Sequence, residues 1–337
     1  MTISKRDALA ACCRYSGITR ALGLLPDKPL LLVLNYHRIG NGDESPYGPD
    51  NFSCTEEQFD GHVRFLKRRM HVASLDEAID LVEKRSLPRR PMALLTFDDG
   101  YVDNYQIAFP VLKSHGVQGL FFLPTAFIGS DRISWWDSVA YIVKHSRKRK
   151  FRLGIPPYRE IDLDAKGPIS PTLQIMYLYK SEGLETSEPF LARLEEACGS
   201  ARPDGSERSF MNWEEAAAML RGGMAIGSHG HSHQILARLA EEEQLAELVT
   251  SKRILEERLG APVRALSYPV GHRNTFSAAT RAAAAEAQYR VAFSFYEGFN
   301  RFGAIDPFDI RRLWVTAAVA RFSLQITLGA ASGSCWF

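Results

Sequence analysis

The chain has 337 residues, 45% hydrophobic and 24% charged, a composition typical of a folded globular protein rather than a disordered or fibrous one. Its 41 basic and 39 acidic residues leave a net charge of +2, so no basic field predicts a nucleic-acid partner. Five cysteines without ligand spacing suggest neither a disulfide framework nor a thiolate metal site, and they favour a reducing compartment.

Residues 1–27 predict an amphipathic helical segment. Its apolar stripe would contain Leu9, Tyr15, Ile18, Leu22 and Leu25. The segment either docks on the rest of the chain, which is the simpler interpretation, or makes a peripheral membrane contact. Leu9-Ala-Ala-Cys12 resembles a bacterial lipoprotein cleavage box, but the preceding apolar stretch is too short for a signal peptide, so we interpret the match as accidental. We expect a cytoplasmic protein. If residues 1–27 contact a membrane, the protein would be peripheral to the inner membrane. We make no prediction of its oligomeric state.

Apolar runs and amphipathic stretches alternate along most of the chain. The apolar runs predict strands at residues 30–36, 92–97, 119–124, 224–228, 265–268, 291–295 and 310–315. The amphipathic stretches predict helices at residues 55–69, 75–84, 104–115, 212–220, 240–259 and 277–288. Capping boxes begin the first two helices, Thr55 with Gln58 and Ser74 with Glu77. This alternation predicts a parallel sheet with helices outside it, as in an α/β barrel or a doubly wound sheet.

Two segments depart from the alternation. Residues 131–209, with a basic run at 144–150, predict a helical and loop insertion whose charges are more typical of a solvated face than of a ligand site. Residues 319–337 are assigned to a C-terminal tail. The apolar stretch 313–330 is interrupted by polar residues such as Arg321, so it predicts a packed or amphipathic segment rather than a membrane span.

Polar clusters follow three of the predicted strands. Asp98 and Asp99 follow the second strand, His229 and His233 follow the fourth, and Tyr268-Pro-Val-Gly271 follows the fifth. The carboxyl ends of parallel strands meet at one edge of a sheet or barrel, where sites are assembled. We therefore expect the three clusters to converge on a single site.

The two acidic residues and the two histidines suggest a metal centre. Asp98 and Asp99 are neighbours on a Gly-ended turn, so they point in different directions and serve different roles, one binding a divalent cation and the other acting as a base. An ordinary surface turn is the alternative. His229 and His233, four residues apart, place both imidazoles on one side of a turn, where two histidines and one acid leave room for water and substrate. An incidental pair is the alternative, and His231 is expected to point elsewhere.

The motif Thr96-Phe-Asp-Asp-Gly-Tyr101, together with Ser228-His-Gly-His-Ser-His233, resembles those of the polysaccharide deacetylases, the NodB-homology carbohydrate esterase family 4. The opening Val33-Leu-Asn-Tyr-His-Arg38 is similar to the branch that includes exopolysaccharide and poly-N-acetylglucosamine deacetylases. The resemblance implies an α/β fold, a deformed (β/α) barrel over residues 28–318. It also implies a catalytic base, Asp98, and three metal ligands, Asp99, His229 and His233.

Two positions in or next to the cluster at the end of the fifth predicted strand depart from the family pattern. Ser267 stands where many relatives have an arginine that orients the base, so Arg311 or Arg312 on the last strand is the candidate substitute, and Arg312 is the one we include among the catalytic residues. Val270 stands where many relatives have a tyrosine. The oxyanion contact of the family at this position is a backbone N–H, which Val270 still supplies.

The general acid is a further departure. No histidine follows His272, so the late Leu-x-His motif that supplies this acid in the family is missing. In the branch with the Tyr-His opening the acid comes from the N-terminal strand, which implies His37. An imidazole is well suited to protonate a leaving amine. A buried structural imidazole is the alternative.

Together these residues predict a hydrolase that removes N-acetyl groups from amino sugars of a poly- or oligosaccharide, in bacterial exopolysaccharide or cell-envelope glycan biosynthesis. Its partner is an acetylated glycan, and its cofactor is a divalent metal, Zn²⁺ first, with Co²⁺, Ni²⁺ or Mn²⁺ as alternatives. An O-acetyl carbohydrate esterase and a non-catalytic carbohydrate-binding protein are the other functions considered. Aromatic residues assigned to substrate contacts, unless they belong to the core, are Tyr101, Trp135, Trp136 and Tyr268, with Phe127 as a further candidate.

Overall fold

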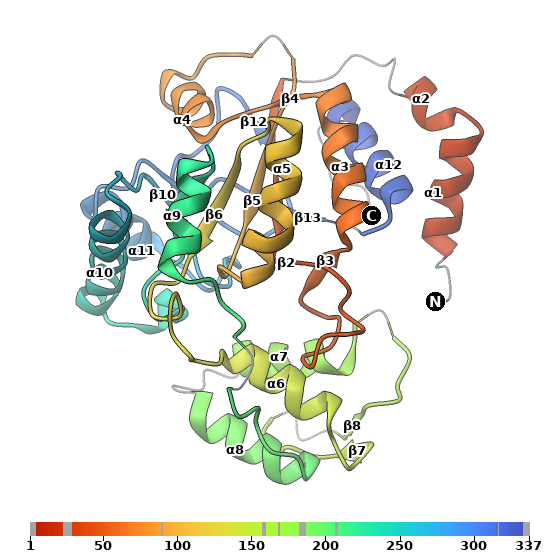
Figure 1. The fold of residues 1–337 in the computed structure, drawn as a ribbon, viewed down its shortest axis with the longest axis vertical. Helices are drawn as coiled ribbons and strands as arrows, with labels where there is room; N and C mark the ends of the chain where they lie inside the picture. Colours follow the sequence, from red (N-terminus) through yellow and green to blue (C-terminus); the bar gives the residue numbers. More distant parts are fainter. Residues whose placement is uncertain are drawn as a thin grey trace. The chain divides into compact units, whose positions relative to one another are not determined.

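The computed structural model of the protein describes residues 5–22, 29–88, 90–156, 160–167, 169–181, 187–205, 208–315 and 317–332. The chain, drawn in sequence colours in Figure 1, divides into two compact units. The first consists of Met1–Gly40, Ser53–Gly129 and Phe210–Phe337, and the second of Asn41–Phe52 and Ser130–Ser209. The segment predicted as an insertion thus makes up most of the second unit, which also takes in the loop after Gly40.

Six parallel strands form the centre of the first unit. In spatial order they are β11 (Val291–Phe293), β10 (Ala265–Ser267), β9 (Ala225–Ser228), β6 (Gly119–Leu123), β5 (Met92–Phe97) and β1 (Leu30–Tyr36). Every residue of β1, β5 and β6 is buried. Strands covered on both faces need no polar alternation, which explains why their sequences are continuous apolar runs.

The two ends of this row of strands are linked near residue 310. Ile310 bridges Phe293 in parallel at one end, and three residues later Leu313 pairs in parallel with Leu34 of β1 at the other. The predicted α/β fold, a deformed barrel, is therefore confirmed. The short strands that complete the sheet are β13 (Leu313–Trp314), β4 (His71–Val72) beside β5, and β12 (Asn300–Arg301), antiparallel to β1.

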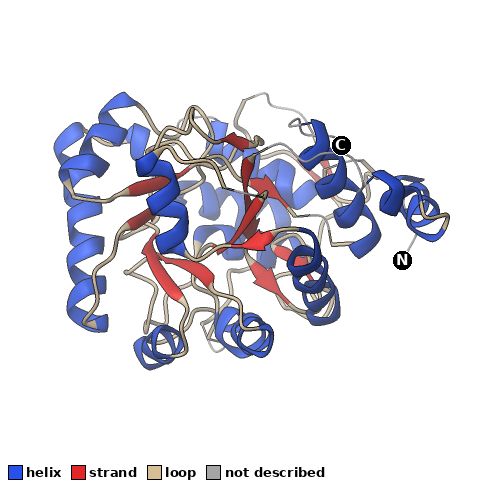
Figure 2. Ribbon diagram, turned by 90° about the horizontal axis from the view of Figure 1, so that it is seen from above, coloured by secondary structure: helices blue, strands red, loops and turns tan. Residues whose placement is uncertain are grey.

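Helices lie outside the strands of the first unit, as Figure 2 shows with strands in red and helices in blue. They include α3 (Glu56–Arg69), α4 (Leu75–Lys84), α5 (Phe109–His115), α9 (Trp213–Arg221), α10 (Glu241–Leu259) and α11 (Ala278–Glu286). Thr55 caps α3 and Ser74 caps α4, each with both reciprocal hydrogen bonds of the predicted capping box. A π-helical turn at Asn104–Ala108 precedes α5, which ends at Gly116 with a φ of 62°.

The two terminal segments pack together within the first unit. The helices concerned are α1 (Lys5–Tyr15), α2 (Ile18–Leu22) and α12 (Val319–Ser332), and α12 also contacts α3. The assigned C-terminal tail therefore contains a helix, on which even Ser323 and Gln325 are buried. The N-terminal segment docks on its own unit, although Leu25 of the predicted stripe lies outside the described residues. Among the described residues no helix is long and apolar enough to cross a bilayer.

The second unit is mainly helical. Ser134 caps its first helix by accepting a hydrogen bond from the Asp137 N–H at 3.1 Å. Its elements are α6 (Trp135–Lys144), α7 (Pro171–Ser181), α8 (Ser187–Cys198) and the antiparallel pair β7 (Lys150–Phe151) and β8 (Ile161–Asp162). Two short paired strands, β2 (Arg38–Ile39) and β3 (Phe52–Cys54), lie where the chain passes from one unit to the other and back.

Candidate active site and metal centre

Asp98 and Asp99 lie in the turn that follows β5. Both are buried, and the Asp98 N–H donates a hydrogen bond to the Tyr36 carbonyl at the end of β1, at 2.9 Å. Asp99 has a φ of 73° and Gly100 a φ of 69°, and a Cβ at Gly100 would lie 2.8 Å from the Ile128 side chain. The Asp-Asp-Gly sequence is thus a buried, strained turn and not the surface turn considered as its alternative.

His229 and His233 lie on the loop that follows β9. Glu247 of α10 accepts hydrogen bonds from the backbone N–H and the hydroxyl of the residue before His233, which fixes the loop. His233 itself has a φ of 59°, a further strained position at this edge of the sheet. His231 points elsewhere, as expected, with its Nδ1 2.8 Å from the Thr125 hydroxyl.

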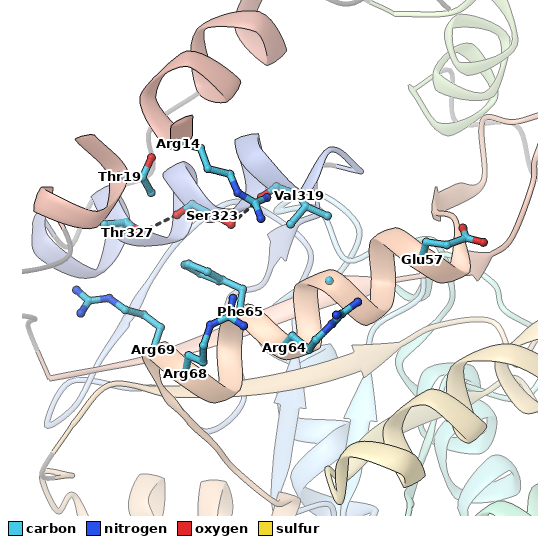
Figure 3. A pocket seen from close by; sticks show the side chains of 11 residues that line it. Arg14, Thr19, Glu57, Arg64, Phe65, Arg68, Arg69, Val319, Ser323 and Thr327 are labelled. Carbon is cyan, nitrogen blue, oxygen red and sulfur yellow. Dashed lines mark hydrogen bonds between the residues drawn. The ribbon is translucent and has the colours of Figure 1, made fainter. Parts of the chain in front are cut away.

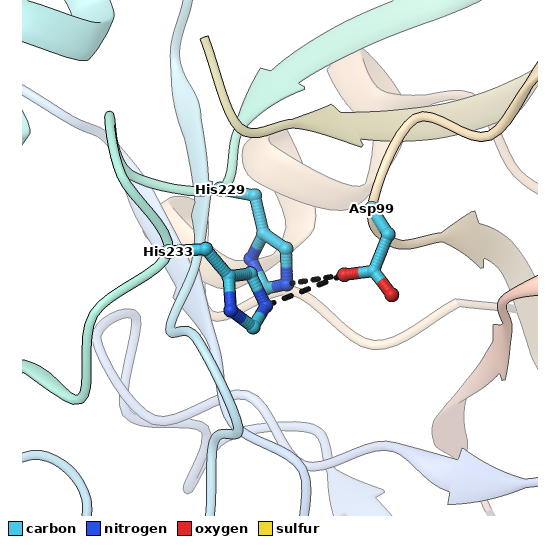
Figure 4. A group of neighbouring side chains, drawn as sticks. All are labelled: Asp99, His229 and His233. Atoms are coloured by element: carbon cyan, nitrogen blue, oxygen red, sulfur yellow. Dashed lines mark ion pairs between the residues drawn. The ribbon is translucent and has the colours of Figure 1, made fainter. Parts of the chain in front are cut away.

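Asp99, His229 and His233 bring three potential ligand atoms together (Figure 4). The Oδ1 atom of Asp99 lies 3.4 Å from Nε2 of His229 and 3.3 Å from Nε2 of His233, and all three atoms lie within 4.8 Å of one another. This buried oxygen has no hydrogen-bond partner among the described residues. A buried polar atom of this kind calls for an ion or water, and one carboxylate with two imidazoles is a donor set that zinc and similar cations prefer. The three residues therefore fit a divalent metal.

The hydrogen bonding of His229 supports this fit. Its Nδ1 lies 2.8 Å from the Ser267 carbonyl, which can only accept, so Nδ1 carries a proton. In a neutral ring Nε2 then presents a lone pair to the acceptor oxygen of Asp99, and a cation between them satisfies both. Without the cation, burial lowers the pKa of His229, but the charges of Asp98 and Asp99 outweigh burial and raise it. Burial likewise raises the pKa of Asp99, yet the nearby imidazoles of His229 and His233 hold it well below its ordinary value.

Asp98 faces a different partner, Arg312. The guanidinium Nη1 lies 2.8 Å from Asp98 Oδ1, and both side chains are almost fully buried. The remaining donors of Arg312 reach the Ser294 carbonyl and the Ser267 hydroxyl, each at 2.9 Å. Burial raises the pKa of Asp98, but the charges of Arg312 and then His229 hold it below the ordinary value. The carboxylate is therefore ionised at neutral pH and able to accept a proton.

Ser267 shows how the arginine just before β13 reaches this carboxylate. Its small hydroxyl hydrogen-bonds the Arg312 guanidinium, whereas the neighbouring Arg311 packs over the Tyr296 ring at 5.4 Å. Of the two arginines considered, Arg312 is the one beside the carboxylate. Asn35, which the sequence analysis missed, contacts both members of the pair, donating to the carboxylate at 3.3 Å and accepting from Arg312 at 3.1 Å. Its only signal was a single amide inside an apolar strand.

His37 lies at the same edge, directly after β1, and is half-buried. Its backbone N–H donates to the Ser53 hydroxyl at 3.0 Å, and its carbonyl accepts from the Asn104 amide at 2.8 Å. Burial lowers the pKa of His37, and the negative charges of Asp99 and Asp98 only partly offset this effect. The backbone on both sides of the ring is thus fixed, and the ring is close enough to feel both carboxylates.

An aromatic group that the sequence analysis missed lies beside His37. The Phe295 ring centroid is 5.8 Å from that of His37 and 5.5 Å from that of Trp314, which is 43% exposed. An exposed indole face of this kind is suited to stack on a sugar. Its sequence signal was a tryptophan two residues after Arg312 on the last strand.

Val270 lies in the turn that follows β10, with a φ of 64°. A β-branched residue in the left-handed region is strained, and such strain clusters at functional sites. The following residue, Gly271, holds the turn, since its N–H donates to the Pro269 carbonyl and its carbonyl accepts from the Phe295 N–H, both at 2.7 Å. No described residue accepts a hydrogen bond from the Val270 N–H, which is therefore available to an oxyanion.

Two residues assigned to substrate contacts belong instead to the core. Tyr101 is fully buried with its ring stacked on Phe210 at 5.2 Å, and Tyr268 is fully buried with its hydroxyl donating to the Phe308 carbonyl at 3.1 Å. Neither ring has an open face for a sugar, so the assignment is corrected. Both follow strand ends, but their side chains turn back into the interior, which the spacing alone did not reveal.

The remaining aromatic candidates also pack against protein. Phe127 is nearly buried, with its ring 5.0 Å from that of Phe210. Trp135 and Trp136 begin α6 in the second unit, where the Trp135 ring lies 4.4 Å from that of Tyr179. Their assignment to substrate contacts stays a prediction.

Comparison with known proteins reveals sequence similarity in two stretches. The sequence model of the family described as polysaccharide deacetylase matches residues 86–165 and 195–292. YxkH of Bacillus subtilis strain 168 is 32% identical over 105 residues, which cover 31% of this chain and 35% of YxkH. A poly-beta-1,6-N-acetyl-D-glucosamine N-deacetylase of Staphylococcus epidermidis is 32% identical over 114 residues, 31% of this chain and 39% of that protein. The chain thus spans well under half of the length of these curated relatives.

Solved structures share the fold over nearly their whole length. The deacetylase PplD of Streptococcus pyogenes, solved in complex with acetate, has a TM-score of 0.59 and 17% identity over 88% of this chain and 97% of its own. IcaB of Ammonifex degensii has a TM-score of 0.58 and 20% identity over 89% of this chain and 98% of its own. At these identities the likeness establishes the fold alone.

Proposed function

This chain belongs to the polysaccharide deacetylase family, and from that premise we propose that it hydrolyses N-acetyl groups on the amino sugars of a poly- or oligosaccharide. The observation that carries the proposal is the buried Asp98–Arg312 pair beside the cluster of Asp99, His229 and His233. The name of the staphylococcal relative suggests polymers of N-acetylglucosamine as the substrate class. A role in exopolysaccharide or cell-envelope glycan biosynthesis is part of the same proposal.

Activation of the attacking water is the first step. A divalent cation held by Asp99, His229 and His233, with Zn²⁺ as the first choice, would supply Lewis acidity toward the acetyl carbonyl. Asp98 accepts the proton of the attacking water, because its carboxylate is ionised and its orientation is fixed by Arg312. Asp99 faces the two histidines and Asp98 faces Arg312, so Asp99 can hold the cation while Asp98 acts as the base.

Two further residues act in the later steps, one on the charge that develops on the acetyl oxygen and one on the leaving amine. The Val270 N–H donates to the developing oxyanion, a contact whose removal typically costs about 3 kcal/mol of transition-state stabilisation. His37 transfers a proton to the amine nitrogen as the carbon–nitrogen bond breaks, which leaves acetate and a free amine. The fixed backbone of His37 supports this role over that of a purely structural imidazole.

The non-catalytic alternative rested on the missing arginine and the missing late histidine. Support for catalysis comes from Arg312, which contacts Asp98 where Ser267 replaces the family arginine. His37 offers an acid from the N-terminal strand. Each of the two roles, orientation of the base and protonation of the amine, therefore has a candidate residue in this chain.

Product analysis tests the proposal. Zn²⁺-loaded protein would be incubated with oligomers of beta-1,6-linked N-acetylglucosamine, chitin oligomers and an O-acetylated xylan, with acetate and new primary amines measured in parallel. We expect acetate and amine in equal amounts from an N-acetylated oligomer, and a slower reaction for His37→Ala. Acetate without amine would identify an ester hydrolase. Neither product from any glycan, with Zn²⁺, Co²⁺, Ni²⁺ or Mn²⁺, would favour the non-catalytic alternative.

A further inference from the structure

A cavity of about 900 Å³ lies between the terminal helices and α3. Its floor is apolar, formed by Gly61, Phe65 and Val319. A Cβ at Gly61 would lie 2.9 Å from the Val319 side chain, so the glycine allows α3 and α12 to approach closely here. The volume is in the range of small-molecule binding sites. None of the residues proposed for catalysis lines it.

The rim of this cavity is rich in arginine, as Figure 3 shows. Arg14 extends from α1, and three arginines, Arg64, Arg68 and Arg69, line the facing side on α3, against the one lining carboxylate of Glu57. Four guanidinium groups around a shared space repel one another unless an anion joins them. Planar guanidinium groups match the oxygens of a phosphate by paired hydrogen bonds.

Partners within the protein neutralise only part of this charge. Arg64 forms an ion pair with Asp60 on its own helix. Arg14 and Arg68 are exposed, and within the described part of the chain neither has a carboxylate partner. An anionic ligand would therefore find at least two guanidinium groups ready to bind it.

Large apolar side chains are exposed on the same terminal helices. Tyr15, the neighbour of Arg14, is 89% exposed, Leu9 is 56% exposed on α1, and Ile18 is 48% exposed at the start of α2. Single exposed apolar residues are ordinary, but three within ten residues beside a basic cavity are typical of helices that lie in the headgroup region of a membrane. The apolar floor between the arginines suits the first carbons of a lipid chain.

We propose that the cavity of Arg14, Arg64, Arg68 and Arg69 binds the phosphate of an anionic phospholipid, and that α1 and α2 dock this face on the membrane surface. Charge complementarity to the headgroups selects this occupant over an uncharged partner. Tyr15 and Ile18 insert at the level of the headgroups, while the phosphate enters the cavity. This inference does not rest on the proposed function, since it involves no catalytic residue.

Vesicle sedimentation with the full chain tests the inference. Vesicles of phosphatidylcholine alone would be compared with vesicles that also contain phosphatidylglycerol. We expect binding to the anionic vesicles only, weakened by salt. Each arginine near an anionic surface contributes about fivefold to partitioning, so Arg14→Gln with Arg68→Gln should weaken binding roughly 25-fold. Tyr15→Ser with Ile18→Ser should also weaken it.

A matched double variant separates the cavity from general charge. Arg193→Gln with Arg221→Gln removes the same charge from exposed positions on α8 and α9 and should bind like the natural protein. Equal binding to both kinds of vesicle, or equal loss in the two double variants, would overturn the proposal. Release from vesicles by inorganic phosphate at matched ionic strength would instead identify a site for free phosphate. Unchanged melting temperatures would show that all variants are folded.

Discussion

Arg312 and Asp98 form a buried ion pair, and we expect both folding and catalysis to depend on it. Arg312→Gln leaves Asp98 buried without its partner at 2.8 Å, and removal of one member of such a pair typically costs about 3–5 kcal/mol. We expect the free energy of unfolding in urea to fall by roughly that amount. We also expect the deacetylation rate to fall by about 100-fold, because the base is no longer oriented.

Arg311→Gln is the matched control for this change. It removes the same charge from the adjacent residue, whose guanidinium lies over the Tyr296 ring and not beside the carboxylate. We expect this variant to keep a rate close to that of the natural protein. Equal losses in the two variants would contradict the role given to Arg312.

Val270 tests whether a backbone N–H contributes to catalysis. Val270→Gly keeps the N–H and adopts a φ of 64° without strain, so we expect a rate near the natural one. Replacement of Val270 by its α-hydroxy acid analogue turns the N–H into an ester oxygen without the fixed φ of proline, and loss of one oxyanion donor typically lowers kcat by about 100- to 1,000-fold. The measurement is kcat for both variants under saturating substrate. If the two rates are alike, the Val270 N–H has no part in oxyanion binding.

At the scale of elements, His62 on α3 ties this helix to the chain before α12. Its Nε2 lies 3.1 Å from the Ala317 carbonyl, and its Nδ1 lies 3.3 Å from the Tyr36 hydroxyl. A neutral ring satisfies both contacts, by donating at one nitrogen and accepting at the other. Burial lowers the pKa of His62 from 6.5 to about 4.

This shift makes the stability of the fold depend on pH. Between these two pKa values the unfolded chain binds the proton and the folded chain does not, so the stabilisation is complete above pH 6.5 and is lost as the pH falls toward 4. Linkage allows a loss of up to roughly 3 kcal/mol. We expect the free energy of unfolding in urea to fall more steeply with decreasing pH over this range for the natural protein than for His62→Gln. Parallel pH curves for the two proteins would contradict this account.

Most elements around the site could be predicted from the sequence because local signals agree with the tertiary structure. Apolar runs became the buried strands, and the capping boxes at Thr55 and Ser74 begin helices where predicted. Two features carried no local signal: the inclusion of residues 41–52 in the second unit and the π-helical turn at Asn104–Ala108. Each depends on contacts with residues distant in the sequence.

The site was predictable to a similar extent. The three proposed ligands and the proposed base lie within two motifs at predicted strand ends. The strand ends predicted that these residues converge, and the family resemblance implied their separate roles. No sequence signal supported the choice of Arg312 over Arg311, because a partner of Arg312, Asn35, is 277 positions away. Trp314 was missed for the same reason, since exposure depends on which strands lie beside it.

At the scale of the whole molecule, a cation bound only by the folded chain should stabilise the entire first unit. Mass action gives about 2.7 kcal/mol at a cation concentration 100 times Kd. We expect chelator-treated protein to melt at a lower temperature than protein reloaded with Zn²⁺. The double variant His229→Gln with His233→Gln should show no such difference.

His231→Gln provides the control, because this imidazole lies between the two ligands in sequence but hydrogen-bonds to Thr125. It should retain the thermal shift on addition of Zn²⁺. A shift of equal size in the double variant would mean that the cation binds elsewhere on the chain.

Asp98, as the proposed base, is the residue that would distinguish a deacetylase from a protein that merely binds metal and sugar. The most direct measurement compares the natural protein with Asp98→Asn for Zn²⁺ content and for the release of acetate and amine from an N-acetylglucosamine oligomer. We predict that the variant binds the same amount of Zn²⁺, because its ligands are Asp99, His229 and His233, yet reacts about 1,000-fold more slowly for lack of a base. An Asp98→Asn protein that deacetylates at the full rate would contradict the account.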